Sequence, residues 1–140
     1  MEVTERDSFT VGEEATIERT FDQQDVEDFA RLSGDTNPVH LNENYAQGTR
    51  FGGRIVHGSL VASLVSAVLG TKLPGPGAIY ASQLLKFKAP VRVGDRLRVV
   101  ARVSEWDSEK GRLTIATDVF CGETIVLTGE ARLTMSSFLK

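Results

Sequence analysis

An aspartate and a histidine stand close together in the run Ser-Gly-Asp-Thr-Asn-Pro-Val-His at residues 33–40, where they are Asp35 and His40. Asn37 precedes a proline, which disfavours helical backbone, so we predict a tight bend between the two side chains. From the two sides of a bend, a carboxylate and an imidazole can converge on one water molecule, which suits general acid–base chemistry. The structural alternative is that Asp35 caps the bend and His40 is a hydrogen-bonded core histidine.

The elements that must position Asp35 are a short strand and a short helix. Alternating apolar residues predict a strand over Ala15–Phe21. An apolar stripe predicts an amphipathic helix over Gln23–Leu32, with Asp22 as its N-cap. Gly34 follows the last apolar residue, where a left-handed residue would end the helix. We therefore expect Asp35 to be held at a helix end.

A glycine-rich segment, residues 47–54, follows a brief helical turn that we expect Asn42 to cap. It contains three glycines and two arginines. One interpretation is a mobile connection. The other is a flap whose arginines, Arg50 and Arg54, bind a phosphorylated ligand. The spacing matches no known phosphate loop, so both interpretations stay open.

A second, longer helix is predicted over Ser59–Thr71. Its residues are apolar or small on all sides and carry no charge before Lys72, which is typical of a helix buried on most of its circumference. Gly58 lies at or near the first turn, where a backbone N–H is unpaired and the helix dipole is positive. Such an N–H is suited to holding a developing oxyanion. We expect the preceding His57 to form a hydrogen bond at the helix start, with a catalytic role as the alternative.

Four strands are predicted after a Pro- and Gly-rich turn. They are Ile79–Ala89, Arg96–Trp106, Arg112–Cys121 and Thr124–Met135. Their short turns predict antiparallel neighbours in chain order. The whole pattern describes an α+β domain in which a curved antiparallel sheet surrounds one long buried helix. So few strands leave open sheet edges, which predicts an edge-to-edge homodimer.

Composition limits the class of protein. The 140 residues fit a single domain spanning 1–140, and a net charge of −3 argues against nucleic-acid binding. The longest apolar run, residues 60–69, is shorter than the ~20 residues of a membrane span. A single cysteine, Cys121, excludes an intrachain disulfide and favours a cytoplasmic location. Residues 1–14 are polar and acidic, without signal-peptide features, and are expected to be a loosely held lead-in.

Cofactor motifs are weak. The two histidines stand seventeen residues apart without a matching acidic pattern, which makes a poor metal-ligand set. The chain has no Gly-rich nucleotide loop and no Gly-x-Ser-x-Gly motif. We therefore expect neither a metal nor a cofactor.

The chain resembles the MaoC-like hydratase family, specifically the short (R)-specific enoyl-CoA hydratases of hot-dog fold. The hydratase signature is an aromatic residue, then Leu-Ser-Gly-Asp-x-Asn-Pro-aliphatic-His, then Ala after five more residues. Phe29, residues 32–35, residues 37–40 and Ala46 fill these places. The likeness continues through residues 55–58, 73–75, 87–91 and 93–95, which extends it over most of the chain. One departure is Asn42, where relatives often carry an acidic residue, and it concerns the local helix cap.

The resemblance implies roles for particular residues. Asp35 and His40 would activate the water that is added to a trans-2-enoyl thioester. The N–H of Gly58 would hold the thioester oxygen as the enolate forms. Three further positions are implied to support the network or line the acyl pocket: Asn37 and Ser66 for the network, and Leu69 for the pocket. A homodimer with acyl-CoA entering near its interface is likewise implied.

The implied activity is (R)-specific hydration of enoyl-CoA in fatty acid metabolism. It would link β-oxidation intermediates to (R)-3-hydroxyacyl-CoA, a precursor for polyhydroxyalkanoate synthesis. One alternative is the reverse chemistry on acyl carrier protein, a 3-hydroxyacyl-ACP dehydratase of fatty-acid synthesis, which a basic patch beside the tunnel would favour. A hot-dog acyl-CoA thioesterase and a non-catalytic acyl-binding protein are the others.

Overall fold

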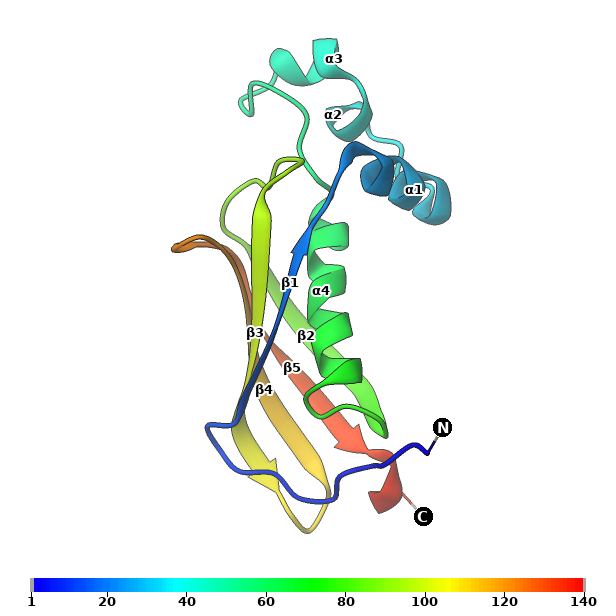
Figure 1. Ribbon diagram of the computed structural model, residues 1–140, viewed down its shortest axis with the longest axis vertical. Coiled ribbons are helices and arrows are strands. Elements are labelled where there is room, and N and C mark those ends of the chain that lie inside the picture. Colours follow the sequence, from blue (N-terminus) through cyan, green and yellow to red (C-terminus); the bar gives the residue numbers. More distant parts are fainter. Residues whose placement is uncertain (1, 140) are drawn as a thin grey trace.

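A five-stranded antiparallel sheet curves around one long helix in this computed structural model, which describes residues 2–139 (Figure 1). Three short helices lie together beyond one end of that long helix (Figure 1). In chain order the elements are β1 (Glu14–Thr20), α1 (Gln23–Ser33), α2 (Pro38–Leu41), α3 (Glu43–Gln47), α4 (Gly58–Thr71), β2 (Ala78–Phe87), β3 (Arg96–Asp107), β4 (Arg112–Cys121), β5 (Thr124–Met135) and the 3₁₀ turn η1 (Ser136–Phe138). This is the predicted α+β arrangement.

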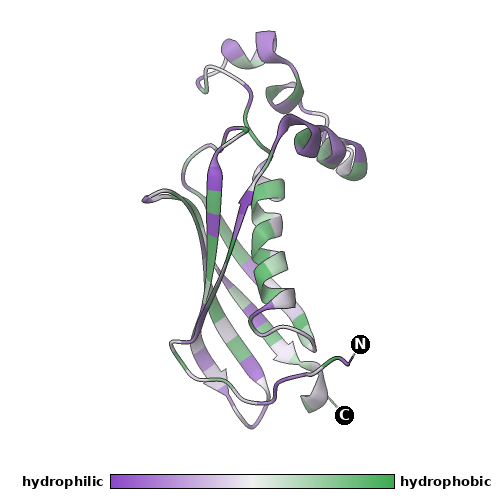
Figure 2. Cartoon of the chain, in the orientation of Figure 1, coloured by the Kyte–Doolittle hydropathy of each residue, from purple (hydrophilic) through white to green (hydrophobic). Residues whose placement is uncertain are grey.

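Helix α4 is the centre of the core. Its apolar residues are almost fully buried: Leu60, Val61, Leu64, Val65, Val68 and Leu69. They pack against the inner face of the sheet, which the alternation of strand β3 supplies through Leu97, Val99, Ala101 and Val103. Figure 2 shows this apolar helix against strands of mixed polarity. The remaining face of α4 is exposed and carries small residues: Ser59, Ser63, Ser66 and Gly70.

The strand order is β1-β3-β4-β5-β2. Strands β3, β4 and β5 form the predicted meander, but the prediction that β2 and β3 are neighbours is wrong, because β2 pairs with β5 instead. The connection, residues 88–95, is too long for a tight hairpin and contains Pro90. Its Val91 carbonyl accepts a hydrogen bond from Val56 N–H at 2.7 Å, so it passes close to the start of α4.

Helix α1 begins and ends as its residues predict. Asp22 is the N-cap, and it forms a capping box with Asp25 in which each side chain accepts from the other's backbone N–H. Gly34 ends the helix with φ of 80°, a left-handed conformation that glycine adopts at little cost. Asp35 therefore follows a defined helix end.

The expected bend at residues 37–38 is the start of a helical turn. Asn37 caps α2 by accepting the Val39 N–H at 3.1 Å, and Pro38 occupies the first helical position, where its missing N–H costs no hydrogen bond. The proline ring disfavours helical backbone only at the residue before it, which is the cap residue Asn37. The residues after Pro38 can therefore form a helix. His40 thus lies on a helix rather than on extended chain.

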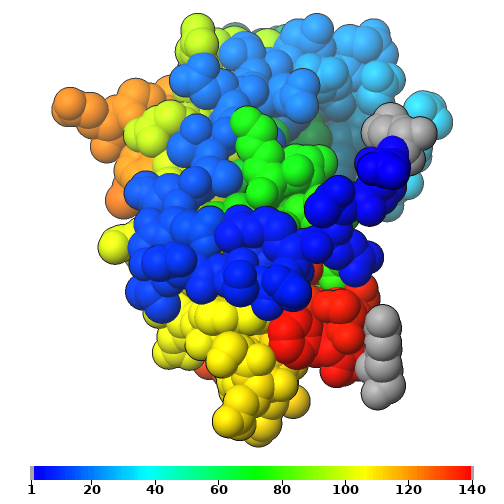
Figure 3. Space-filling model, turned by 60° about the horizontal axis from the view of Figure 1, so that its bottom comes forward, coloured from blue at the N-terminus to red at the C-terminus, as the bar shows by residue number. Residues whose placement is uncertain are grey.

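The N-terminal segment is docked, so the expectation of a loosely held lead-in is wrong. The Phe9 ring is buried and meets Trp106 edge-on, with ring centroids 5.1 Å apart. Gly12 N–H donates to the Val103 carbonyl at 2.8 Å, and Val103 N–H donates to the Glu13 carbonyl at 2.9 Å. Figure 3 shows this segment in dark blue lying across the molecule beside α4. No helix within residues 2–139 is long and apolar enough to cross a membrane.

Candidate active site

Asp35 is fixed through its backbone while its side chain stays exposed. The Ser33 hydroxyl donates to the Phe29 carbonyl at 2.7 Å and accepts the Asp35 N–H at 3.1 Å. One carboxylate oxygen of Asp35 accepts the Asn37 N–H at 3.3 Å. The residues around the helix end therefore set where the carboxylate lies, and leave its second oxygen open to a ligand.

His40 is buried, and its two ring nitrogens have different roles. Nδ1 lies 2.8 Å from the Ile55 carbonyl oxygen, which can only accept, so Nδ1 carries the hydrogen and Nε2 is the acceptor. Burial lowers the pKa of His40 below its ordinary 6.5, because desolvation disfavours the charged ring; the Ile55 hydrogen bond and the Asp35 charge act in the opposite direction. A neutral imidazole with Nε2 open is a general base.

His57 joins this pair, a position that the sequence did not predict. Its ring is 1% exposed and stacks on the His40 ring with centroids 3.8 Å apart. Its Nε2–H donates to the Asp35 carbonyl at 2.9 Å, and Phe29 meets the ring edge-on at 4.9 Å. His57 Nδ1 is buried without a partner within residues 2–139. The one sequence feature that could have pointed to His57 as a site residue is that the chain has only two histidines.

The three groups lie close enough to share a small ligand. One carboxylate oxygen of Asp35 and one ring nitrogen from each histidine lie within 4.8 Å of one another. A water can lie 2.6–3.2 Å from both Asp35 and His40 at that separation. A shared metal fits less well, because the two rings are stacked at 28° and their in-plane lone pairs do not meet at one ion, as Zn–N bonds of about 2.0–2.1 Å require.

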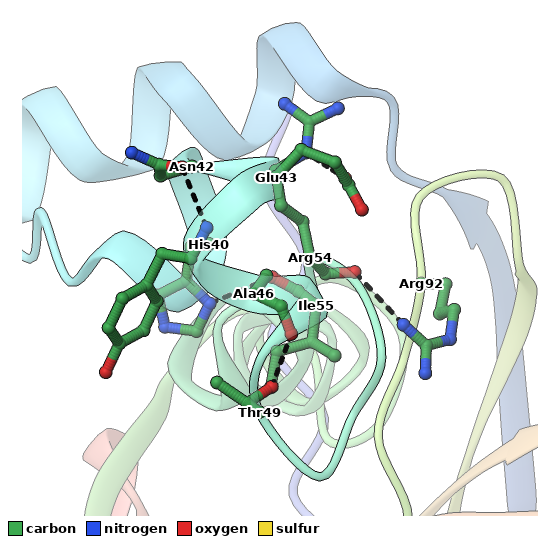
Figure 4. Close-up of polar contacts among 9 residues, drawn as sticks. His40, Asn42, Glu43, Ala46, Thr49, Arg54, Ile55 and Arg92 are labelled. Atoms are coloured by element: carbon green, nitrogen blue, oxygen red, sulfur yellow. Dashed lines mark hydrogen bonds and ion pairs between the residues drawn. The ribbon is translucent and has the colours of Figure 1, made fainter.

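A pocket of about 280 Å³, here called the flap pocket, is lined by Val56 and Gly58, the two chain neighbours of His57. Its walls are Arg50 and Phe51, residues 87–91, Val126, and residues between 55 and 61 that include Gly58. Gly58 is the first residue of α4, and a Cβ there would lie 2.8 Å from the Phe87 ring. Ile55 also lines the pocket, and its carbonyl is the one that binds His40 (Figure 4). The pocket and the cluster are therefore linked through residues 55–58, although Asp35, His40 and His57 are not among the residues that line the pocket.

Of the other predicted site residues, Asn37 lies in the cluster, whereas Ser66 and Leu69 do not line the flap pocket. Asn37 lies in the cluster as the cap of α2 and as a backbone donor to Asp35. Ser66 is on the exposed face of α4, and Leu69 is 1% exposed within the core. Neither Ser66 nor Leu69 lines the flap pocket.

The fold and the signature residues define the class of protein. The model of the MaoC like domain family matches residues 8–126, and the chain belongs to this family. The solved (R)-hydratase from A. caviae, involved in PHA biosynthesis, superposes with a TM-score of 0.87 at 42% identity, covering 91% of this chain and 98% of that one. This likeness confirms the predicted hot-dog fold.

Two relatives are more similar still in sequence. The (R)-specific enoyl-CoA hydratase of Rhodospirillum rubrum is 50% identical over 120 residues, which are 86% of this chain and 83% of the relative. The 3-hydroxybutyryl-CoA dehydratase of Methylorubrum extorquens is 48% identical over 121 residues, which are 86% of this chain and 77% of the relative.

Proposed function

We propose that this protein is an (R)-specific enoyl-CoA hydratase, a hydro-lyase that adds water to trans-2-enoyl-CoA and forms (R)-3-hydroxyacyl-CoA. The observation that carries the proposal is the pairing of the Asp35 carboxylate with the buried His40 imidazole, whose Nε2 is its acceptor nitrogen. The hydratases and dehydratase that the chain resembles support the same reaction.

The mechanism divides the reaction between a base and an oxyanion donor. Asp35 and His40 hold one water, and His40 Nε2 accepts its proton as the oxygen bonds to C3. The C2=C3 electron pair moves into the thioester and forms an enolate, whose oxygen accepts the Gly58 N–H at the start of α4. One such donor is worth ~3–4 kcal/mol. The proton then moves from His40 to C2, so no cofactor takes part.

The surrounding residues complete the proposal. His57 holds the Asp35 backbone through a hydrogen bond to its carbonyl, and the Asn37 N–H holds the Asp35 carboxylate. Ser66 as a supporting residue and Leu69 as an acyl-pocket residue rest on the family resemblance alone.

We also propose a cytoplasmic homodimer built from single-domain chains of residues 1–140. Strand β2 is an edge strand of the sheet, so one side of its backbone has no strand partner in the single chain. It also exposes four large apolar side chains: Ile79, Tyr80, Leu84 and Phe87. Pairing two β2 strands would extend the sheet and cover this apolar surface.

The test is a steady-state assay with crotonyl-CoA. We expect loss of the conjugated enoyl absorbance and formation of (R)-3-hydroxybutyryl-CoA, identified by chiral chromatography. Release of free CoA without hydration would identify a thioesterase, and an (S) product would contradict the proposal.

A further inference from the structure

The flap pocket has apolar walls and two positively charged side chains. Among residues 2–139, Arg50 and Lys88 are the only charged residues that line it. Both are exposed, and neither forms an ion pair with any residue in 2–139. The other lining residues are apolar, apart from the backbone of Gly58. An apolar pocket with two unpaired cations at its rim fits a ligand that is apolar at one end and anionic at the other.

Of the two flap arginines, Arg54 is already neutralised. Its Nε lies 2.9 Å from a Glu43 carboxylate oxygen, and it is not among the residues that line the flap pocket. The Arg50 guanidinium instead lies over the Phe51 ring, 4.9 Å from its centroid. The two arginines that the sequence analysis considered together are therefore separated, and Arg50 alone is available to a ligand in this pocket.

The flap is held in place, which keeps Arg50 at the pocket rim. Arg92 donates to the Phe51 carbonyl. It also donates to the Arg54 carbonyl at 3.4 Å (Figure 4). The Thr49 hydroxyl donates to the Ala46 carbonyl at 2.6 Å and accepts the Phe51 N–H at 3.2 Å. The flap is thus bonded to α3 at its start and to the β2–β3 connection near its end, and the interpretation of residues 47–54 as a mobile connection is disfavoured.

The substrate of the proposed function has the matching chemistry. Enoyl-CoA is apolar at its acyl end and carries phosphate at the far end of its pantetheine arm. A pocket of about 280 Å³ lies at the lower limit of sites that enclose a small ligand, so it can hold the thioester region while hydrated phosphate stays outside. Arginine binds phosphate with paired N–H groups, and lysine adds a point charge.

We propose that Arg50 and Lys88 form a phosphate-binding subsite for the pantetheine arm of the thioester substrate. The inference rests on the proposed hydratase function and adds to it the residues that recognise the carrier portion of the substrate. Phosphate is common to coenzyme A and to the phosphopantetheine of an acyl carrier protein, so the subsite serves either source.

The test compares two substrates that differ in phosphate. Crotonyl-CoA carries phosphates, whereas the crotonyl thioester of N-acetylcysteamine has none. We expect Arg50→Gln and Lys88→Gln each to raise KM for crotonyl-CoA by about tenfold with kcat unchanged, as loss of one charge-assisted contact predicts. KM for the N-acetylcysteamine thioester should stay at the wild-type value. The matched control is Lys86→Gln, an exposed lysine of β2 that does not line the pocket.

The outcomes separate the subsite from the activity itself. Equal increases in KM for crotonyl-CoA and the N-acetylcysteamine thioester, or no increase for either crotonyl-CoA or crotonyl-acyl carrier protein, would overturn the subsite. A wild-type protein that hydrates neither thioester would overturn the hydratase function instead. Crotonyl-acyl carrier protein is the third substrate in the test. If KM rises in the variants only for this substrate, the subsite is supported, and the phosphate that it binds is that of the carrier protein's phosphopantetheine.

Discussion

At the scale of single residues, the chemistry depends on which nitrogen of His40 is open. The Ile55 carbonyl fixes the hydrogen on Nδ1, and burial keeps the ring neutral to lower pH than an exposed histidine. Since only the neutral ring accepts a proton, the base form persists as pH falls below neutrality and is lost when pH passes through the lowered pKa.

The first prediction concerns this titration, followed by NMR of the imidazole resonances. The pKa of His40 should lie below 6.5. His57→Phe should raise the pKa of His40, because it removes a neighbouring ring whose charge opposes protonation. Asp35→Asn should lower it further, because the carboxylate favours the charged ring. The acidic limb of kcat/KM should move with the pKa in His57→Phe, and a His40 titration at or above 6.5 in the wild type would contradict the account.

The sequence was sufficient for some of the site residues and insufficient for others. Asp35 and His40 lie within one short signature, so local pattern was enough to select them. His57 is distant in sequence from both, and its stacking on His40 arises only when the start of α4 packs against α2. Local sequence carries no information about such a tertiary contact. The interpretation in which Arg54 binds a ligand did not include its partner Glu43, for the same reason.

At the scale of elements, the close approach of other residues makes two glycines structurally important. Gly129 of β5 lies beneath β2, and a Cβ there would overlap the Leu84 carbonyl oxygen. Gly58 faces the ring of Phe87, a residue that is 56% exposed. A backbone carbonyl cannot move without displacing its strand, whereas an exposed ring can, so we expect substitutions at the two glycines to differ in effect.

The second prediction is that Gly129→Ala destabilises the fold. The displacement of β2 from β5 should lower the free energy of unfolding by more than ~3 kcal/mol in urea denaturation. Gly70→Ala is the control, since nothing lies within 4 Å of a Cβ there and alanine favours the helix by about 0.5–1 kcal/mol. A Gly129→Ala protein as stable as the wild type would show that β2 and β5 are not this close.

The third prediction is that Gly58→Ala impairs substrate binding and spares stability. The new methyl group should turn the Phe87 ring into the flap pocket and raise KM for crotonyl-CoA several-fold, with a change in unfolding free energy of less than ~1 kcal/mol. Adding Phe87→Ala removes the clash and should restore KM. If the double variant is as impaired as Gly58→Ala alone, the ring is not the cause.

Strand bounds were predictable from alternation and turns, but the strand order was not. β4 and β5 begin and end at the predicted residues because a short Gly-Glu turn joins two strongly alternating segments. The pairing of β2 with β5 follows from the path of residues 88–95 past the start of α4, and that path depends on contacts distant in sequence.

At the scale of the whole molecule, the exposed edge of β2 predicts association. Leu84→Glu should convert the proposed homodimer to monomer in sedimentation velocity, because it places a charge within the apolar surface of that strand. Ile125→Glu is the matched control: Ile125 is 41% exposed on β5, outside the β2 surface, and its substitution should leave the dimer intact. A Leu84→Glu protein that remains dimeric would place the interface elsewhere.

The most direct measurement of the central claim is a double-mutant cycle on the hydration of crotonyl-CoA. Asp35→Asn and His40→Gln should each lower kcat/KM by ~10²–10⁴ without loss of folding. Because both side chains act on one water, the double variant should be about as slow as the slower single variant. Near wild-type hydration in either single variant, or losses that multiply in the double variant, would contradict a shared water between Asp35 and His40.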